Sequence, residues 1–325
     1  MTMLNIDTIL SIRTDAEFEV CALELFRYQS VYCEPYRRYV ELLGIDPSEV
    51  QSIEEIPFMP IRLFKSTDVY CGEHAPEVTF TSSNTGSTIA SRHMMASLEA
   101  YRKTFTAAFK EFYGEPAKWS IYGLLPNYLE REGSSLVYMV DTLIRECGSG
   151  GFYLNDYERL IADIEADPKP KILLGVSYAL WDVAEQYAPK LANTIIMETG
   201  GMKGRRKELS KSELHAILTA SFGVEHIHSE YGMAELTSQA YSAGEGIFHT
   251  PKWMRVLVRD VNDPFDHTPA GGRGGIDIID LANLSSCAFI QTEDMGRLYA
   301  DGSFSIEGRI AGSDIRGCNL LVHNM

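Results

Sequence analysis

The spacing of hydrophobic and polar residues separates a helical beginning of the chain from an alternating middle part and a strand-rich final part. Near the N-terminus, Thr14 and Glu17 form a capping box, and apolar residues recur every three or four positions as far as Tyr28. A second amphipathic helix is predicted from Pro35 to the helix-ending Gly44. We therefore predict that residues 1–70 form a helical preface packed on the main domain.

Apolar runs and helical spacing alternate through the middle of the chain. Buried strands are predicted at residues 119–125, 171–176 and 194–197. Helices are predicted at residues 97–113, 134–144 and 179–185, and after the capping box that begins at Ser210. This alternation favours parallel strands joined by crossover helices, so the predicted fold class is α/β.

After Glu235 the pattern changes to short apolar or alternating runs separated by turns. Val256, Ile276 and Ile290 lie in such runs, and the turns between them are rich in Gly, Asn and Asp. The pattern predicts an antiparallel or barrel-like β subdomain near residues 250–308. We expect the α/β core, with this subdomain, to span residues 71–308 and residues 309–325 to form a short stub.

The composition is that of an ordinary globular protein, with 325 residues, 23% charged and 45% hydrophobic. A formal net charge of −16 argues against a nucleic-acid-binding protein, because it would repel a phosphate backbone. There is no N-terminal secretion signal and no apolar run of about 18 residues, so no membrane association is expected and the location is predicted to be cytoplasmic. The six cysteines are widely spaced without a zinc-site pattern, and we expect most of them to be reduced.

A polar stretch follows the β-favouring residues 78–80. Hydroxyl, amide and glycine residues can present backbone N–H groups and side-chain donors to an anion, although an exposed polar loop has the same composition. No Gly-Lys-Ser/Thr follows, so this is not a Walker loop. The candidate anion-binding residues are Thr81, Ser82, Ser83, Asn84, Thr85 and Gly86.

Residues 229–235, Ser-Glu-Tyr-Gly-Met-Ala-Glu, are predicted to lie where a strand ends and a helix begins. In an open α/β sheet, such a loop borders the ligand crevice, and Gly232 lets the backbone approach a ligand closely. Tyr231 offers a flat ring to an aromatic base, and Glu235 offers a hard oxygen to Mg²⁺. The alternative is a simple turn followed by an exposed glutamate on a helix.

Other polar residues have two interpretations each. Residues 203–207 contain the densest basic cluster of the chain, which either binds phosphate or is a solvated turn. His93 either orients substrate or phosphate, or has a structural role. His226 and His228 alternate on one predicted strand, where packing is favoured over metal binding because no third ligand is evident.

Several separated segments together resemble the motifs of the adenylate-forming ligase superfamily, which includes the acyl-CoA synthetases and phenylacetate-CoA ligases. These are residues 81–86, 231–235 and 292–297, followed by Gly308 and Arg309. More narrowly, residues 91–93, 198–201, 203–208 and 312–318 resemble the acyl-protein synthetases (LuxE type) of bacterial fatty-acid reductase systems. The likeness extends from about Ile56 to the end of the sequence.

The resemblance implies a fold and a reaction. It implies layered sheets flanked by helices, as in the N-terminal domain of these ligases, with a small β subdomain and without the C-terminal lid domain. The implied reaction uses ATP and Mg²⁺ to convert a carboxylic acid, expected to be a fatty acid, into an acyl adenylate. The acyl group would then form a thioester on the enzyme's own cysteine and pass to an acyl-CoA reductase-like partner.

The resemblance also assigns roles in nucleotide binding. Residues 81–86 would hold the β- and γ-phosphates, and Glu235 would hold Mg²⁺. Asp294 would accept hydrogen bonds from both ribose hydroxyls, because a carboxylate has two acceptor oxygens. Arg309 would reach the ribose or a phosphate. Tyr231 would stack on the adenine beside Gly200 and Gly201, and Gly232 and Met233 would also bind the nucleotide.

Cys318 is the implied acyl acceptor. Arg316 lies two residues away, which favours a lowered thiol pKa, and Gly317 favours access to the sulfur. The alternative is a buried small hydrophobic residue among the leucines that follow. His93 and Lys203 are weaker candidates for substrate binding.

The sequence departs from the family pattern at the phosphate loop and the adenine motif. Ser83 and Asn84 replace the usual Gly and Thr, Ser87 replaces a lysine, and Ala234 lacks the usual hydroxyl. Losing one such donor in a closed site lowers a rate by a factor on the order of 10² to 10³. Two alternatives therefore stay open: a catalytically reduced nucleotide-binding or scaffold subunit of a reductase complex, and an ATP-independent acyltransferase. Which of Lys203, Arg205 and Arg92 replaces the missing lysine is also open.

Overall fold

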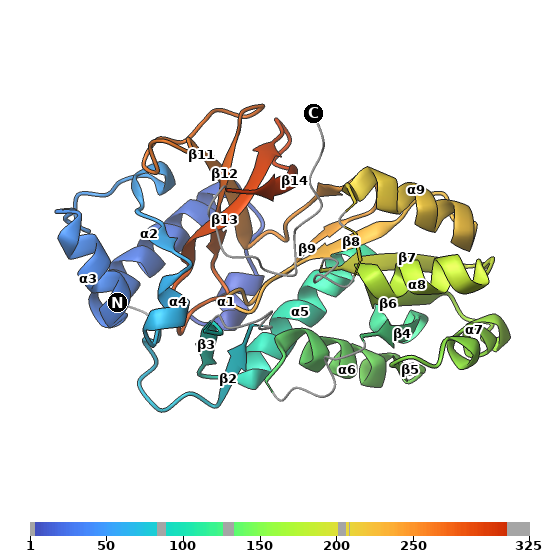
Figure 1. The fold of residues 1–325 in the computed structure, drawn as a ribbon. Coiled ribbons are helices and arrows are strands. Elements are labelled where there is room, and N and C mark those ends of the chain that lie inside the picture. The colour runs from blue at the N-terminus through green and yellow to red at the C-terminus, as the bar shows by residue number, and fades with distance from the viewer. Residues whose placement is uncertain (1–3, 83–88, 126–132, 201–205, 208, 311–325) are drawn as a thin grey trace.

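A computed structural model describes residues 4–82, 89–125, 133–200, 206–207 and 209–310 (Figure 1). Two six-stranded sheets, a two-stranded hairpin and flanking helices organise this part of the chain. The hairpin consists of β2 (Val78–Thr81) and β3 (Arg92–Met95). The layered α/β fold predicted from the sequence is confirmed.

The first sheet carries the parallel strands that the alternating pattern predicts. Its strand order is β5-β4-β6-β7-β8-β9, with the first five strands parallel and β9 antiparallel to β8. Every residue of β4 and β6 is buried, as expected for strands covered on both faces. The strands are β4 (Ser120–Leu124), β5 (Gly150–Tyr153), β6 (Lys171–Val176), β7 (Thr194–Thr199), β8 (His228–Tyr231) and β9 (Ala240–Ser242).

Helices cover both faces of this sheet. The chain passes from β4 through α6 to β5 in one direction, and from β6 through α8, β7 and α9 to β8 in the other. Right-handed crossovers therefore place α6 on one face and α8 and α9 on the opposite face. Figure 1 shows α5 beside α6 and α8 beside α9. The helices are α5 (Leu98–Tyr113), α6 (Ser135–Cys147), α7 (Tyr157–Ala166), α8 (Ser177–Tyr187) and α9 (Lys211–Phe222), with the short 3₁₀ helix η2 (Pro116–Lys118) after α5.

The second sheet confirms the antiparallel subdomain predicted after Glu235. Its order is β10-β14-β13-β12-β11, and β1 pairs in parallel with β13. A bridge between Tyr241 and His249 joins β9 to the start of this sheet. The strands are β1 (Met59–Pro60), β10 (Ile247–Phe248), β11 (Met254–Arg259), β12 (Arg273–Asp280), β13 (Phe289–Leu298) and β14 (Phe304–Arg309).

The N-terminal helices pack against the second sheet. The predicted capping box of Thr14 is present, and α2 begins at the next residue. Phe26 of α2 meets Phe289 of β13 edge-on, with ring centroids 6.0 Å apart. Gln29 is fully buried; its Nε2 donates to the Asn283 carbonyl and its Oε1 accepts from the Ala288 N–H, both at 2.8 Å. The elements are α1 (Ile6–Leu10), α2 (Asp15–Tyr32), α3 (Glu34–Leu42), η1 (Ile53–Glu55) and α4 (Leu63–Ser66).

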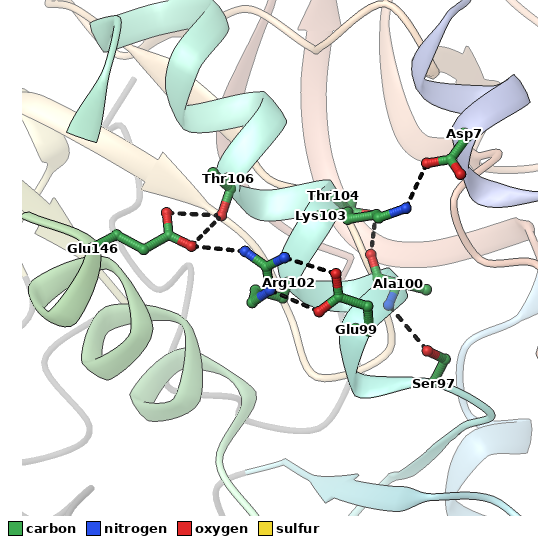
Figure 2. Close-up of polar contacts among 9 residues, drawn as sticks. All are labelled: Asp7, Ser97, Glu99, Ala100, Arg102, Lys103, Thr104, Thr106 and Glu146. Carbon is green, nitrogen blue, oxygen red and sulfur yellow. Dashed lines mark hydrogen bonds and ion pairs between the residues drawn. The ribbon is translucent and has the colours of Figure 1, made fainter. Parts of the chain in front are cut away.

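Polar contacts on α5 join it to α1 and α6 (Figure 2). Lys103 pairs with Asp7 of α1 at 2.7 Å, and Arg102 pairs with Glu146 of α6 at 3.0 Å. Such exposed pairs contribute at most about 1 kcal/mol each. The buried rings of α5, including the fully buried Phe105, therefore fix the position of this helix more strongly.

One local prediction was wrong. No helix follows Tyr231, because the N–H groups of Thr237 and Ser238 donate to the buried carboxylate of Asp280 instead of to helical carbonyls. Gly150 begins β5. Its φ is +101°, and a Cβ there would overlap the Ile121 carbonyl, so only glycine fits. None of the described helices is both long and apolar enough to cross a membrane.

Replacement of Gln29 tests the contact between α2 and the second sheet. Gln29→Leu should lower the free energy of unfolding by about 2–4 kcal/mol, because a buried carbonyl and a buried N–H each lose their partner. Urea denaturation measures the change. Val31→Ala on the same helix, where the side chain is 53% exposed, should change it by less than about 0.5 kcal/mol. A Gln29→Leu protein as stable as the parent would contradict the proposed importance of these hydrogen bonds.

Candidate functional site

One pocket collects residues from segments that are far apart in the sequence. It has an empty volume of about 950 Å³, including solvent at its mouth. Its lining includes residues from all three motif segments. These are Thr81 and Ser82 at and after the end of β2, Gly232 to Glu235 after β8 and Thr292 to Asp294 in β13, together with Gly200 after β7 and Arg309 at the end of β14. The pocket lies at the carboxyl edge of the parallel sheet, the usual position of a ligand crevice in this architecture.

The Asp294 carboxylate is held in a fixed position at this pocket. The Tyr231 hydroxyl donates to its Oδ2 at 2.9 Å, and Nε of Arg309 lies 3.8 Å from its Oδ1. The backbone N–H of Asp294 donates to the Thr292 hydroxyl at 3.1 Å. Asp294 is buried yet lines the pocket.

Tyr231 does not occupy the position predicted from the sequence. Its ring is buried against Phe248 and Phe304, with centroid distances of 5.8 and 5.5 Å, and it is not part of the pocket lining. Its contact with the site is through its hydroxyl, which orients Asp294. The predicted stacking of this ring on an adenine is therefore not supported. The backbone of Gly200, Gly232 and Met233 lines the pocket instead.

Glu235 lines the pocket although it is fully buried, so it is not the exposed helical glutamate of the alternative interpretation. The second sheet holds its loop from behind. Asn283 Nδ2 donates to the Glu235 carbonyl at 3.0 Å, and Asp280 accepts the N–H groups of Thr237 and Ser238 at 2.8 Å each. The backbone that carries the Glu235 carboxylate is thus fixed before any ligand binds.

His93 belongs to this supporting network rather than to the pocket wall. Its Nδ1 is 2.8 Å from the Ala234 carbonyl and its Nε2 is 2.8 Å from Asn283 Oδ1. Burial lowers its pKa. Both ring nitrogens contact protein groups and the ring is absent from the pocket lining, which favours the structural interpretation. His228 contacts the Tyr113 hydroxyl at 3.1 Å, in agreement with the packing role expected for it.

Arg309 lines the pocket from the end of β14. Its Nη2 donates to Glu293 at 2.5 Å, and Glu293 also pairs with Arg62. Arg309 is only about a tenth exposed, so its guanidinium is held at the pocket by these carboxylates. A charge held in this way can approach a phosphate or ribose without reorganisation.

A buried ion pair lies behind the pocket, where β7, β8 and α9 meet. Lys211 pairs with Glu198 at 2.5 Å, and Glu198 also accepts from the hydroxyls of Ser229 at 2.6 Å and Ser177 at 3.0 Å. Burial raises the pKa of Glu198, but the charge of Lys211 and contacts with His215 outweigh it, so the pKa is well below its usual value. Glu198 is therefore an ionised structural anchor.

Glu230 is a pocket residue to which the sequence reasoning assigned no role. The Thr199 hydroxyl donates to its Oε2 at 2.5 Å, and the residue lines the pocket. Burial, with the nearby charge of Glu198, raises its pKa to about 7, although the Thr199 hydrogen bond and Lys211 oppose the shift. The feature of the sequence that could have identified Glu230 is its position within a predicted strand, directly before Tyr231 and Gly232.

Several predicted residues fall outside the part of the chain that the structure describes. These are Ser83, Asn84, Thr85, Gly86, Gly201, Lys203 and Cys318. Of the basic cluster, Arg206 pairs with Asp182 and Glu185 on α8, and Arg92 pairs with Asp68, so neither lines the pocket. The five cysteines that are described are all free and buried. Within the described ranges, no group of three or more His, Cys, Asp or Glu residues is arranged as a metal site.

Comparison of the whole fold identifies adenylate-forming ligases as structural relatives. A 2-hydroxyisobutyryl-CoA ligase, solved in an open conformation in complex with 2-HIB-AMP and CoA, matches with a TM-score of 0.68 and 15% identity, over 93% of this chain and 76% of that chain. ATP-bound MatB from Rhodopseudomonas palustris matches with a TM-score of 0.55 and 15% identity, over 73% of this chain and 49% of that one. The amide bond synthetase McbA from Marinactinospora thermotolerans matches with a TM-score of 0.50 and 17% identity, over 75% and 51%.

These similarities establish the fold, which is that of the N-terminal domain of adenylate-forming ligases. The matched part spans about half the length of MatB and McbA. Neither a protein-family model nor a curated protein matches the sequence.

The buried pair of Lys211 and Glu198 predicts a pH-dependent loss of stability. Lys211→Met should lower the free energy of unfolding at pH 8 by about 3–5 kcal/mol, because it leaves a buried carboxylate without its cation. The loss should shrink on acidification, because the isolated Glu198 then takes up a proton in the folded state. In the parent protein the free energy of unfolding changes with pH in the opposite direction. The lowered pKa of Glu198 stabilises the fold at pH values above the pKa of about 4.3 in the unfolded chain, and this stabilisation is lost as the pH falls.

Urea denaturation at pH 8 and pH 5 measures the effect of Lys211→Met, and denaturation of the parent at about pH 3 measures the loss of the Glu198 contribution. The double variant Glu198→Gln with Lys211→Met should recover part of the stability, and Lys118→Met at an exposed position serves as the matched control. A Lys211→Met loss that is the same at both pH values would contradict the assignment of an ionised Glu198.

Proposed function

We propose that this protein uses ATP to activate a carboxylic acid as an acyl adenylate. The observation that carries the proposal is the meeting of three polar segments, from after β2, after β8 and in β13, in one pocket at the carboxyl edge of the parallel sheet. The fold shared with ligases supports it, and one of these was solved with 2-HIB-AMP and CoA bound. A carboxylate is a poor electrophile, and a mixed anhydride with phosphate gives its carbonyl carbon a good leaving group.

The described residues fit a nucleotide bound across this pocket. Asp294, oriented by Tyr231, would accept the ribose hydroxyls. The backbone of Gly200, Gly232 and Met233 would lie against the base. Thr81 and Ser82 line the pocket at the start of the proposed phosphate loop, which continues through residues 83–86. Arg309 would reach the ribose or a phosphate from β14.

The donor set also fits Mg²⁺. Glu235 presents a carboxylate to the pocket from a backbone held by Asn283, and Mg²⁺ is usually bound by one or two carboxylates together with phosphate oxygens and water. A small number of protein ligands is therefore the expected arrangement. The bound ion would neutralise charge on the phosphates during the reaction.

The proposed reaction has two steps. First, an oxygen of the substrate carboxylate attacks the α-phosphorus of ATP, the bond from this phosphorus to the bridging oxygen of pyrophosphate breaks, and pyrophosphate leaves. Second, the Cys318 thiolate attacks the acyl carbon, and AMP leaves with the electrons of the broken C–O bond. The resulting thioester would pass to an acyl-CoA reductase-like partner, a step that rests on the resemblance to acyl-protein synthetases.

Chain length supports Cys318 as the acceptor. Arg309 lines the pocket, and Cys318 follows it by nine residues (318 minus 309). Nine extended residues span at most about 30 Å, which is sufficient to bring a thiol from the end of β14 back to the pocket.

A second candidate function is a nucleotide-binding subunit without turnover. Ala234 lines the pocket and presents a methyl group at the position where the resemblance expects a hydroxyl for the α-phosphate. Nucleotide affinity without any acid-dependent reaction would favour this candidate over the ligase.

Exchange of labelled pyrophosphate into ATP tests the first step. We expect exchange that depends on Mg²⁺ and on a carboxylic acid, measured with a panel of acids. Glu235→Gln should reduce the rate by a factor on the order of 10² to 10³, because a fixed charge at the phosphates is lost. Glu54→Gln, at an exposed position of η1, is the matched control and should leave the rate unchanged. The absence of exchange with every acid would reject the ligase function.

Covalent labelling tests the second step. Cys318→Ser should retain exchange but lose the acid-derived label that withstands denaturation and is released by hydroxylamine. Cys21→Ser, at the edge of the core, is the matched control and should keep the label. Persistent labelling of Cys318→Ser would place the nucleophile at another residue. Labelling from an acyl carrier without ATP would identify an acyltransferase.

A further inference from the structure

Part of the pocket lining is formed by residues outside the nucleotide motifs. α5 contributes Tyr101, α6 contributes Met139, β7 contributes Thr199, and the segments around β8 and β9 contribute Glu230 and Gln239. We call this group the pocket floor. Asp294 and Arg309 come from the second sheet, whereas the floor belongs to the first sheet and its helices. If the ribose lies at Asp294, the floor is available to the acid.

The hydroxyl donors of the floor are already used within the protein. The Tyr101 hydroxyl donates to the Ser135 carbonyl at 3.3 Å. The Thr199 hydroxyl donates to Oε2 of Glu230 at 2.5 Å. Neither donor is left for a ligand without breaking an existing hydrogen bond.

One acceptor of the floor has no partner within the described residues, and the carboxylate of Glu230 lies beside it. Oε1 of Gln239 is buried and accepts no hydrogen bond from the described part of the chain. A Cβ on Gly232 would overlap Oε1 of Glu230 and would lie 3.5 Å from Cγ of Gln239, so both side chains lie beneath the Gly232 turn. Both line the pocket. A ligand that covers them without donating a hydrogen bond would leave Oε1 of Gln239 buried and unpaired, which is unfavourable.

We propose that the acid activated by this protein carries a hydrogen-bond donor, a hydroxyl or an ammonium group, which donates to Glu230 and Gln239. The inference rests on the proposed function and narrows its substrate class from fatty acids to acids with a polar substituent. An unsubstituted alkyl chain would exclude water from both acceptors and replace none of its hydrogen bonds. A site built to bind a hydroxyl or amino group rejects an analogue that lacks it far more strongly than an apolar pocket rejects a missing methylene.

The charge of Glu230 bears on the choice between the two donors. Burial and the neighbouring Glu198 raise the pKa of Glu230 to about 7, so neither protonation state is strongly preferred at neutral pH. An ammonium group would hold Glu230 in its ionised form and pair with it. A hydroxyl group can donate to Glu230 in either protonation state, because each state has an oxygen that carries no proton. The two classes of acid are therefore distinguished directly by comparing them as substrates.

Matched sets of acids test the inference by pyrophosphate exchange. Each set has one carbon skeleton of four or six carbons, with no substituent, a hydroxyl group or an amino group, placed at successive positions. We expect kcat/KM for at least one hydroxy or amino acid to exceed that of its unsubstituted counterpart by tenfold or more. Equal or better use of unsubstituted acids, with exchange intact, would overturn this inference and leave the proposed function standing. The absence of exchange with all acids would reject both.

Two variants locate the recognition. Glu230→Gln and Gln239→Met, which preserve side-chain size, should each reduce the preference for the substituted acid by about tenfold, while the affinity for ATP measured by calorimetry stays unchanged. Glu54→Gln is the control and should keep the parent preference. Since the two substitutions are independent, failure of one variant to fold leaves the other as the test. A fall in ATP affinity with an unchanged acid preference would assign the floor to the nucleotide and overturn the inference.

Discussion

The site depends on the hydrogen bonds between the second sheet and the loop after β8. Asp280 is the last residue of β12, and Asn283 follows shortly after it. Their side chains hydrogen-bond the backbone of this loop, in place of helical carbonyls or solvent. His93 adds a contact from the β2–β3 hairpin. Two separate parts of the fold, the second sheet and the β2–β3 hairpin, thus hold residues 232–239. These hydrogen bonds keep the loop in its pocket-lining conformation and out of the helix that the sequence predicted after Tyr231.

Such a network stabilises a structure only when its members find partners. Asp280 accepts from Ser238 through both oxygens, and Trp253 in turn donates to the Ser238 hydroxyl at 2.9 Å. Burial raises the pKa of Asp280, and the hydrogen bonds from Ser238 and Thr237 oppose that shift. A partly satisfied network of this kind would be worse than an apolar core. The site therefore gains rigidity from polar groups that elsewhere would destabilise the protein.

Much of the fold could be predicted from the sequence because its determinants are local. The apolar run at residues 171–176 coincides with β6, and the capping boxes at Thr14 and Ser210 coincide with the starts of α2 and α9. The convergence of the three motif segments was implied by their resemblance to the motifs of adenylate-forming ligases. By contrast, the loop after Tyr231 is decided by Asp280, more than 40 residues later, and no local pattern contains that information.

Side-chain roles were harder to predict than backbone positions for the same reason. Tyr231 was expected at the surface of the pocket, but its ring packs against Phe248 and Phe304, which come from two later strands. Glu230 received no role, because its importance depends on Thr199 from the neighbouring strand β7 and on Glu198, both brought close only by the sheet register. A sequence motif therefore indicates where the backbone of a residue lies, whereas the contacts and the pKa of its side chain depend on residues of neighbouring strands.

The parallel pairing of β1 with β13 has a consequence for solubility. β14 covers only residues 294–298 of the same edge of β13, and β1 covers Ile290 and Gln291 next to it. Without β1, the hydrophobic beginning of β13 would present unpaired backbone groups to other molecules, a template for intermolecular strand addition. Pro60 has no N–H to offer at the outer side of this pair, which discourages further strands. The N-terminal segment thus protects the second sheet, which contributes Asp294 and Arg309 to the pocket, from pairing with strands of other molecules.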